Sequence, residues 1–332
     1  MSIGVHMLVM GIESSAHTFG VGIVDGKRII ANEKEMYPID TRGMIPSKVA
    51  EFHARNFDNV IKRALESASV GIGDIEGIGY TKGPGLGPCL QVGELAAKTI
   101  AHEKSIPIAE VHHGVAHIEI AKLTARLNDP VALYVSGGNS QILKKRKEPF
   151  SHYHVLGETF DIGVGNMLDS FARELKLRPA WGSAVAKEAE GGRYIKMPYT
   201  VKGMDFSFTG LLTRATSMIG KASSKDLCFS IQETAFAMLC EATERALMLT
   251  GSRELCVCGG VAQSARLREM LDDMASEHRI RFGAAPNDYN ADNGAMIAYV
   301  AERMIENGIV SRPRDCSIMQ KYRIDKAEVP WS

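Results

Sequence analysis

One structural device occurs twice in this chain, at residues 8–26 and again at residues 131–143. In each copy, two apolar segments flank a turn built from glycine and small polar residues, which is the pattern of a β-hairpin. A third segment, residues 254–258, reads as a buried strand that ends at Gly259 and Gly260 and precedes a helical pattern at residues 262–274. A glycine turn between a strand and a helix N-terminus predicts an anion-binding site.

Helical periodicity separates these landmarks. Residues 46–67 are amphipathic, residues 227–249 form a long apolar-rich segment, and a helix is predicted from Leu90 after a rigid proline-containing turn. The chain of 332 residues, 45% of them hydrophobic, is long enough for two domains with cores of their own. The sequence therefore predicts an α/β protein.

Two histidines follow the predicted strand at residues 106–111. His113 and His117 are four residues apart, so on a helix they are neighbours that could share one cation. A histidine pair at this spacing is more often an ordinary surface or core pair, so the spacing alone leaves both interpretations open.

Composition limits the partners and the compartment. The 39 Lys and Arg residues balance 39 Asp and Glu residues, so no overall field attracts nucleic acid, and any polyanion must be held by a local patch or by a partner. The sequence contains neither a membrane span nor a signal peptide, which favours the cytoplasm. The six cysteines lack a paired spacing, so we expect no disulfides.

Four further motifs stand in a fixed order along the chain. They are the His113/His117 pair, Tyr134-Val135-Ser136-Gly137-Gly138-Asn139, residues 165–169 ending in Asp169, and residues 292–298 beginning with Asp292. Together with the hairpins they resemble the TsaD family of tRNA threonylcarbamoyladenosine synthases, formerly called glycoproteases, and within it the archaeal and eukaryotic branch, the catalytic subunit of the KEOPS complex. The resemblance covers residues 7–325.

The resemblance implies the duplicated fold of actin, sugar kinases and heat-shock chaperones, with two domains that clasp a nucleotide. We expect an N-terminal domain at residues 7–130 and a C-terminal domain at residues 131–300. Residues 301–325 would then form a helix and tail that pack back on the first domain.

The resemblance also implies a metal site made of His113, His117, Tyr134 and Asp292. Nitrogen donors favour transition metals over magnesium, so the divalent ion is expected to be iron or zinc. The implied reaction transfers the threonylcarbamoyl group from threonylcarbamoyl-AMP to the adenosine 3′ of the anticodon, in tRNAs that read codons starting with adenosine. We assign no general base.

The remaining implied residues bind the substrate and an ATP- or AMP-type nucleotide. Backbone N–H groups of Ser136, Gly137 and Gly138 are expected near the adenylate, because glycine permits a close approach. Asp169 would bind the ribose with Gly182 beside it, although a lone Asp of this kind is ordinarily a helix-surface residue. The full set is Tyr134, Val135, Ser136, Gly137, Gly138, Asp169, Gly182, Gly259 and Gly260.

The chain departs from the family pattern at several positions. The family's Pro-Gly-Gly-Pro run is Ala180-Trp181-Gly182-Ser183 here, Ala186 replaces a Glu near the ribose, and Ser264 lies where the family has an Asn after the glycine turn. Loss of one buried polar contact weakens binding by about 1 kcal/mol. These changes predict weaker nucleotide binding.

The partners implied by the resemblance are tRNA, a small dimer-forming KEOPS subunit and a small atypical kinase. The helices at residues 46–67 and 90–102 are candidates for docking the dimer-forming subunit, though core packing is the ordinary role of their apolar residues. The chain has no kinase motifs, so the kinase would be a separate protein. Alone, the chain should bind tRNA poorly.

Three other functions are open on the sequence. A metalloprotease is disfavoured because Gly114 follows His113, where the His-Glu-x-x-His motif supplies a general base. A small-molecule kinase of the same fold would not need the two histidines. A noncatalytic or weakly active nucleotide-binding scaffold is favoured by the departures at Trp181, Ala186 and Ser264.

Overall fold

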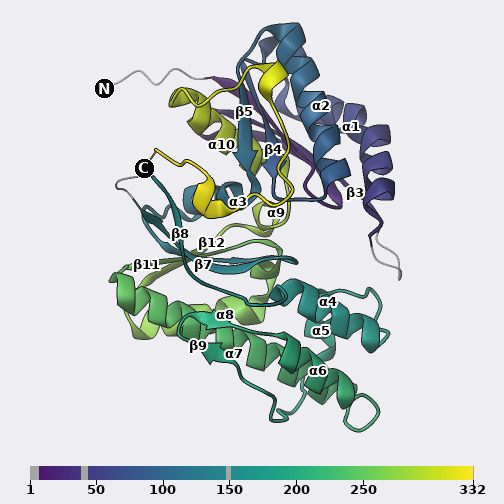
Figure 1. Ribbon diagram of the computed structural model, residues 1–332, viewed down its shortest axis with the longest axis vertical. Coiled ribbons are helices and arrows are strands. Elements are labelled where there is room, and N and C mark those ends of the chain that lie inside the picture. The colour runs from purple at the N-terminus through teal and green to yellow at the C-terminus, as the bar shows by residue number, and fades with distance from the viewer. Residues whose placement is uncertain (1–6, 39–43, 147–150, 332) are drawn as a thin grey trace. The chain divides into compact units, whose positions relative to one another are not determined.

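The structure is a computed structural model that describes residues 7–38, 44–146 and 151–331. Two compact units divide the chain (Figure 1). The first comprises Met1–Ile120, Arg146–Tyr153 and Ala291–Ser332, and the second comprises Ala121–Lys145 and His154–Asn290. The boundaries differ from the contiguous domains expected from the sequence, because the segment after Ala291 returns to the first unit.

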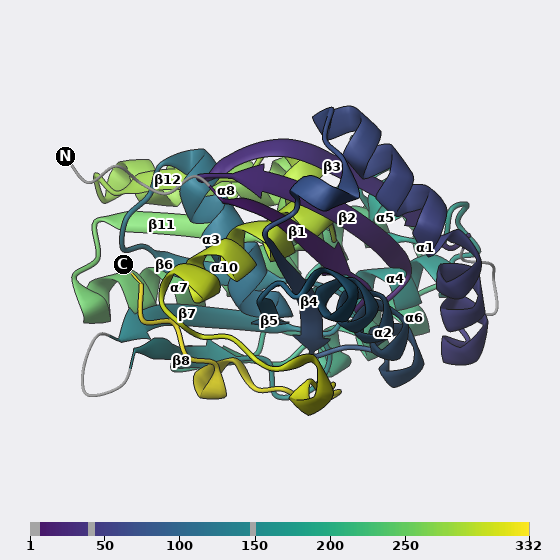
Figure 2. The ribbon, with the colours of Figure 1, turned by 90° about the horizontal axis from the view of Figure 1, so that it is seen from above.

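The first unit is built on a five-stranded sheet with the order β3-β2-β1-β4-β5. Strands β1 (Leu8–Glu13), β2 (Thr18–Asp25) and β3 (Arg28–Met36) are antiparallel neighbours, and they run side by side in Figure 2. Strands β4 (Gly77–Gly83) and β5 (Ile108–His112) run parallel to β1. The first predicted hairpin, β1–β2, is confirmed.

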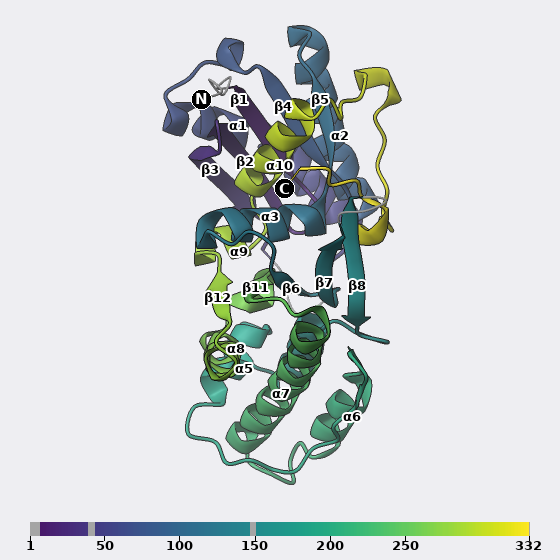
Figure 3. The same ribbon diagram turned by 90° about the vertical axis from the view of Figure 1, so that its left-hand side faces the viewer.

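Helices cover both faces of this sheet. Helices α1 (Pro46–Ala68) and α2 (Gly87–Lys104) pack on a core that includes Met10 and Ile12 of β1. Helix α10 (Gly294–Glu306) crosses β1, β2 and β4 (Figure 3). It lies directly on the strand backbones, since a Cβ on Gly11 would come within 2.0 Å of the Ala298 nitrogen.

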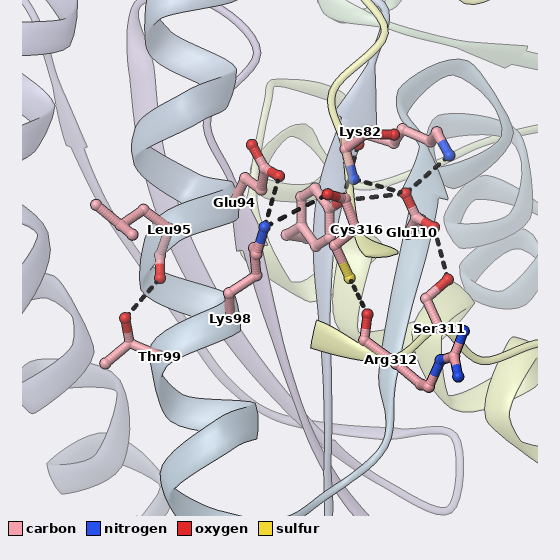
Figure 4. Close-up of polar contacts among 11 residues, drawn as sticks. Lys82, Glu94, Leu95, Lys98, Thr99, Glu110, Ser311, Arg312 and Cys316 are labelled. Carbon is pink, nitrogen blue, oxygen red and sulfur yellow. Dashed lines mark hydrogen bonds and ion pairs between the residues drawn. The ribbon is translucent and has the colours of Figure 1, made fainter. Parts of the chain in front are cut away.

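The chain after α10 crosses the edge of the first sheet. Ser311 Oγ donates to Glu110 Oε1 at 2.6 Å, and Lys82 Nζ donates to Glu110 Oε2 at 2.7 Å (Figure 4). Lys98 of α2 contacts the Cys316 carbonyl oxygen at 3.4 Å. The C-terminal segment is thus fastened to β4, β5 and α2 by a half-buried polar network centred on Glu110.

The second unit repeats the sheet topology. Its order is β12-β11-β6-β7-β8, formed by β6 (Val131–Val135), β7 (Ser140–Arg146), β8 (His152–Glu158), β11 (Glu254–Cys258) and β12 (Arg281–Ala284). Strands β6 and β7 form the second predicted hairpin, and β11 and β12 run parallel to β6 as β4 and β5 do to β1. The predicted α/β fold with a duplicated strand order is confirmed.

Helices pack on the second sheet around the long helix α7 (Ser224–Thr250), which matches the predicted helix at residues 227–249. The others are α4 (Val164–Glu174), α5 (Gly182–Glu188), α6 (Thr209–Ser217) and α8 (Ala265–Glu277), with a short ribbon of β9 (Val201–Lys202) and β10 (Asp205–Phe206). Helix α8 starts later than predicted because Gly260–Gln263 form a 3₁₀ turn and the Ser264 side chain caps the helix by accepting from Leu267 N.

All six cysteines are free thiols, as predicted. Within the described ranges, no helix combines the length and the hydrophobicity that a membrane span requires.

Candidate metal centre and substrate turn

The two histidines lie at the start of helix α3 (His113–Ala125), directly after β5. Both are buried, with exposed fractions of 7% for His113 and 1% for His117. Their ring centroids are 4.6 Å apart and the rings are perpendicular. The predicted one-turn spacing therefore brings the two imidazoles together inside the first unit.

Asp292 approaches the pair from the turn before α10. Its Oδ1 lies 3.3 Å from His117 Nε2 and 3.6 Å from His113 Nε2, and the ligand atoms of the three residues all lie within 4.8 Å of one another. The next residue, Asn293, caps α10 by accepting from Met296 N at 3.0 Å. This cap fixes the backbone beside Asp292. The structure thus assembles three of the four predicted ligands.

The fourth predicted ligand, Tyr134, lies in a different part of the chain. It is buried on β6 of the second unit, opposite Cys258 of β11 in the sheet. Its part in a four-residue ligand set therefore stays a prediction.

Glu13, which the sequence analysis did not assign to the site, lies behind His113. This carboxylate is fully buried at the end of β1 and accepts from His113 Nδ1 at 3.0 Å, Thr81 Oγ1 at 2.7 Å and Ser15 N at 2.6 Å. Because the carboxylate accepts at Nδ1, the His113 ring carries its proton there and presents Nε2 toward Asp292. The signal in the sequence was a Glu at the end of an otherwise apolar strand.

The charges of the cluster are strongly coupled. Burial lowers the pKa of His113, but the Glu13 and Asp292 carboxylates outweigh burial and raise this pKa to about 9. Burial raises the pKa of Asp292, but this effect is outweighed. The hydrogen bond to His117 and the positive charge of His113 hold the pKa of Asp292 well below its usual range. Burial lowers the pKa of His117. One fully buried carboxylate, Glu13, and one partly buried carboxylate, Asp292, therefore lie beside two imidazoles, one of them neutral.

This donor set fits a divalent cation. Two carboxylates bring two negative charges to the site, and a cation held by His113, His117 and Asp292 would balance them without the second proton that makes the His113 ring an imidazolium. Imidazole nitrogens together with one carboxylate suit a transition metal such as iron or zinc. The Glu13–His113 contact is the carboxylate–histidine arrangement that commonly supports such ligands.

The predicted substrate turn follows β6 in the second unit. The turn rests on the start of α4, where Gly165 N donates to the Ser136 oxygen at 3.2 Å and Asn166 N donates to the Gly137 oxygen at 3.1 Å. Ser136 N donates to the Asn139 oxygen at 2.8 Å within the turn, so its expected contact with the adenylate stays a prediction. Among the described residues, the N–H groups of Gly137 and Gly138 have no such acceptor, so they remain the donors of the turn.

Two more predicted segments meet at this end of the sheet. A Cβ on Gly259 would come within 2.4 Å of the Val135 oxygen, so the glycine turn after β11 lies against the end of β6. Asp169 of α4 accepts from Gly182 N at 2.7 Å and so holds the first residue of α5. The structure therefore brings Asp169 to Gly182 and Gly259 to Val135, and their part in binding a nucleotide stays a prediction.

Two of the expected departures from the family pattern, Trp181 and Ala186, lie at α5, and the third, Ser264, caps α8. Trp181 is the residue before α5, and its carbonyl oxygen accepts from Ala184 N at 2.9 Å. Ala186 is half-buried one turn after Gly182. A methyl group thus occupies the position where the sequence resemblance implies a carboxylate.

These features define a class of protein first: an α/β protein with a duplicated actin-like fold, a His/His/Asp cluster with both histidines buried in one unit, and a glycine-rich turn in the other. Two solved structures share this fold. HypF of Thermococcus kodakarensis aligns with a TM-score of 0.61 and 14% identity over 92% of this chain and 48% of that one. The activator of the 2-hydroxyisocaproyl-CoA dehydratase from Clostridium difficile, with bound ADPNP, aligns with a TM-score of 0.54 and 12% identity over 91% of this chain and 97% of that one.

Sequence comparison identifies the family. The profile of TsaD, tRNA N6-adenosine threonylcarbamoyltransferase, matches residues 27–299. The enzyme of that name from Thermococcus kodakarensis is 46% identical over 98% of this chain and 100% of its own length. A probable bifunctional tRNA threonylcarbamoyladenosine biosynthesis protein from Methanothermobacter thermautotrophicus is 45% identical over 98% of this chain and 61% of its own length. The chain belongs to the TsaD family of tRNA N6-adenosine threonylcarbamoyltransferases.

Proposed function

We propose that this chain transfers the threonylcarbamoyl group from threonylcarbamoyl-AMP to N6 of the adenosine 3′ of the anticodon, in tRNAs that read codons starting with adenosine. The N6 nitrogen attacks the carbamoyl carbon, the bond from that carbon to the AMP phosphate oxygen breaks, AMP leaves with the electron pair, and the nitrogen loses one proton. The observation that carries the proposal is the buried His113–His117–Asp292 cluster in a chain 46% identical over nearly its full length to a named transferase.

The proposal includes one divalent metal ion, iron or zinc, held by His113, His117 and Asp292, with Tyr134 as the fourth ligand that the family resemblance implies. When bound, such an ion polarises a carbonyl or phosphoryl oxygen as a Lewis acid. Glu13 holds the His113 ring so that Nε2 keeps its direction. Burial excludes water from both imidazoles.

The second unit would bind the nucleotide part of the substrate. The N–H groups of Gly137 and Gly138 are suited to hold adenylate oxygens, since neither residue has a Cβ to block a close approach. Asp169 would accept from a ribose hydroxyl while it holds Gly182, and Gly259 and Gly260 would border the adenosine. This arrangement orients the anhydride, which is the main contribution of a site without a general base.

The partners are part of the same proposal. The N-terminal helices offer an apolar surface to a small dimer-forming KEOPS subunit, since Ile45 before α1 is 53% exposed and Leu95 of α2 is 67% exposed, and α1 packs on α2. The kinase would be a separate protein, and tRNA the second substrate. The setting for this reaction is the cytoplasm.

A second candidate is a noncatalytic or weakly active nucleotide-binding scaffold of the same complex. The observation that favours it is Ala186 of α5, which stands where the resemblance implies a Glu near the ribose. A scaffold would bind nucleotide but would not consume threonylcarbamoyl-AMP.

The test is transfer of radiolabelled threonine to tRNA, with an adenylate-forming enzyme present and the partner subunits added or omitted. We expect product with the wild-type chain, and none with His113→Ala. The matched control is His154→Ala, which removes an exposed imidazole on β8 and should retain transfer. No product from the wild type with every partner present would refute the transferase and favour the scaffold.

A further inference from the structure

The second unit contains a strongly basic segment in a chain that has no net charge. Residues 173–225 include ten Lys and Arg residues and four Asp and Glu residues, an excess of six positive charges. The rest of the chain therefore has an excess of six negative charges. The ten basic residues lie at the ends or on the surfaces of α4, α5 and α6, in β9, at the start of α7, and in the loops between these elements.

All ten basic side chains are exposed. Within the described part of the chain, none of them forms an ion pair, whereas Arg245 of α7 is paired with Glu241 and Arg266 of α8 is paired with Glu233. The ten are Arg173, Lys176, Arg178, Lys187, Arg193, Lys196, Lys202, Arg214, Lys221 and Lys225. Uncompensated exposed charges of one sign create a local attractive potential for a polyanion.

The segment forms one helical cluster. Helix α4 packs on α5 and α6, and both α5 and α6 pack on α7 (Figure 1). Apolar residues such as Phe171 of α4, Val185 of α5 and Leu211 of α6 are buried in the common core. The charged side chains therefore lie on the outside of a folded cluster.

Two exposed aromatic rings lie within the same segment. Tyr194 is 54% exposed and Tyr199 is 48% exposed. The Tyr194 hydroxyl lies 3.2 Å from Thr234 Oγ1, and the Tyr199 hydroxyl donates to Glu241 Oε2 at 2.5 Å, so α7 holds both rings by their polar ends. Held, exposed rings among basic residues are suited to stacking on unpaired bases.

We propose that the α4–α6 basic face, meaning the exposed basic side chains of residues 173–225 of the second unit, docks the tRNA by its sugar–phosphate backbone. The inference rests on the proposed function, which makes tRNA the substrate. Phosphate contacts provide much of the affinity for a nucleic acid, and a chain of zero net charge must make them through a local patch. The acidic remainder of the chain repels RNA, so the docked tRNA is directed to this face. The exposed rings favour RNA over an acidic protein as the occupant, because an acidic protein offers no bases for them to stack on.

The test compares two triple variants of the full-length chain. The face variant combines Arg173→Gln, Lys187→Gln and Arg214→Gln, one from each of α4, α5 and α6. Glutamine keeps the helix propensity while it removes the charge. The affinity for an unmodified tRNA transcript is measured by fluorescence anisotropy between about 20 and 200 mM salt, the range over which phosphate contacts are screened.

The control variant combines Arg28→Gln, Lys321→Gln and Lys326→Gln. These residues are equally exposed and lie in the first unit. A second face variant combines Lys196→Gln and Lys221→Gln in loops with Lys202→Gln at the end of β9, and it replaces the first if the melting temperature of the helical variant falls.

We expect the face variants to bind tRNA about tenfold more weakly than the wild type at about 0.1 M salt. The slope of log affinity against log salt concentration should be smaller in magnitude by about 2 to 3, because three phosphate contacts are lost. The control should match the wild type. Equal affinity and equal slope for wild type, face variants and control would overturn the proposal. Binding is measured without threonylcarbamoyl-AMP, so a wild type that binds through this face but transfers nothing refutes the proposed function and leaves the docking face intact.

Discussion

Glu13→Gln tests whether the carboxylate behind His113 orients a metal ligand. Glu13 Oε2 accepts from both His113 Nδ1 and Thr81 Oγ1, and Oε1 accepts from Ser15 N. An amide has one acceptor oxygen and one donor nitrogen. In one orientation the NH₂ group of the glutamine would face Ser15 N, and in the other it would face His113 Nδ1 and Thr81 Oγ1. In either orientation at least one buried donor loses its acceptor.

The magnitude follows from that loss. An orphaned buried donor lowers the free energy of unfolding by about 1 to 3 kcal/mol. Removal of a carboxylate behind a histidine ligand lowers metal affinity by about 10- to 100-fold. Zinc affinity is measured by competition with a chromophoric chelator at about pH 7.5, above the ordinary pKa of histidine, and stability by urea denaturation of the metal-free chain.

Glu119→Gln is the matched control. Glu119 is as deeply buried and lies on α3 itself, but it accepts from Tyr153 Oη at 2.5 Å and Trp331 Nε1 at 3.1 Å. The Glu119→Gln variant should be less stable than the wild type, but its zinc affinity should stay within about threefold of the wild-type value, a binding free-energy difference below about 1 kcal/mol. Wild-type zinc affinity in Glu13→Gln, or an equal loss in Glu119→Gln, would show that Glu13 does not position the site.

Three further predictions concern the fold and the nucleotide. Gly22→Ala places a Cβ 2.2 Å from the Ala295 nitrogen, so urea denaturation should show a free energy of unfolding lower by about 1 to 3 kcal/mol. The control Gly210→Ala, which has open space around its Cβ, should show no decrease. Burial raises the pKa of Glu110, but Lys82, Ser311 and Ser317 outweigh burial and lower it. The stability that Glu110 contributes is therefore present above its unfolded pKa of about 4.3 and is lost as the pH falls through the lower folded value. The stability difference between wild type and Glu110→Gln should be full at about pH 7 and shrink below about pH 4; a difference independent of pH would contradict this. Ala186→Glu should tighten AMP binding about fivefold by calorimetry, equivalent to about 1 kcal/mol, and no change would show that α5 does not border the ribose.

The sequence predicts local structure well where a single segment carries the pattern. The two hairpins, the helices at residues 46–67 and 227–249, and the one-turn spacing of His113 and His117 are all visible in short windows. Each of these predictions is confirmed. They succeed because hydrophobic periodicity and glycine turns determine structure within a short stretch of sequence.

The division into units was not predictable in this way. Helix α10 follows the second unit in sequence but packs on β1 and β2, and nothing in its own periodicity says which sheet it covers. A signal existed in the first hairpin, where Gly11 and Gly22 leave no side chain under the helix. Two glycines in a strand pair are also ordinary turn or bulge residues, so the signal was ambiguous.

The site shows the same limit. Glu13 and Asp292 reach His113 from positions far apart in the chain, so the carboxylate behind the imidazole became visible only in three dimensions. The Ser136 N–H is expected near the adenylate from its place in a glycine turn, and only the structure shows that it donates to the Asn139 oxygen within that turn. Internal hydrogen bonds of a turn cannot be read from residue type alone.

The central claim is that this chain itself carries out the transfer step. Preformed threonylcarbamoyl-AMP, unmodified tRNA, metal and partner subunits are mixed with the chain, and AMP and the nucleosides of digested tRNA are measured by mass spectrometry. The account predicts one AMP released for each threonylcarbamoyladenosine formed, and neither product beyond background with His117→Ala. AMP release without modified adenosine, or modification that persists at the wild-type rate in His117→Ala, would contradict it.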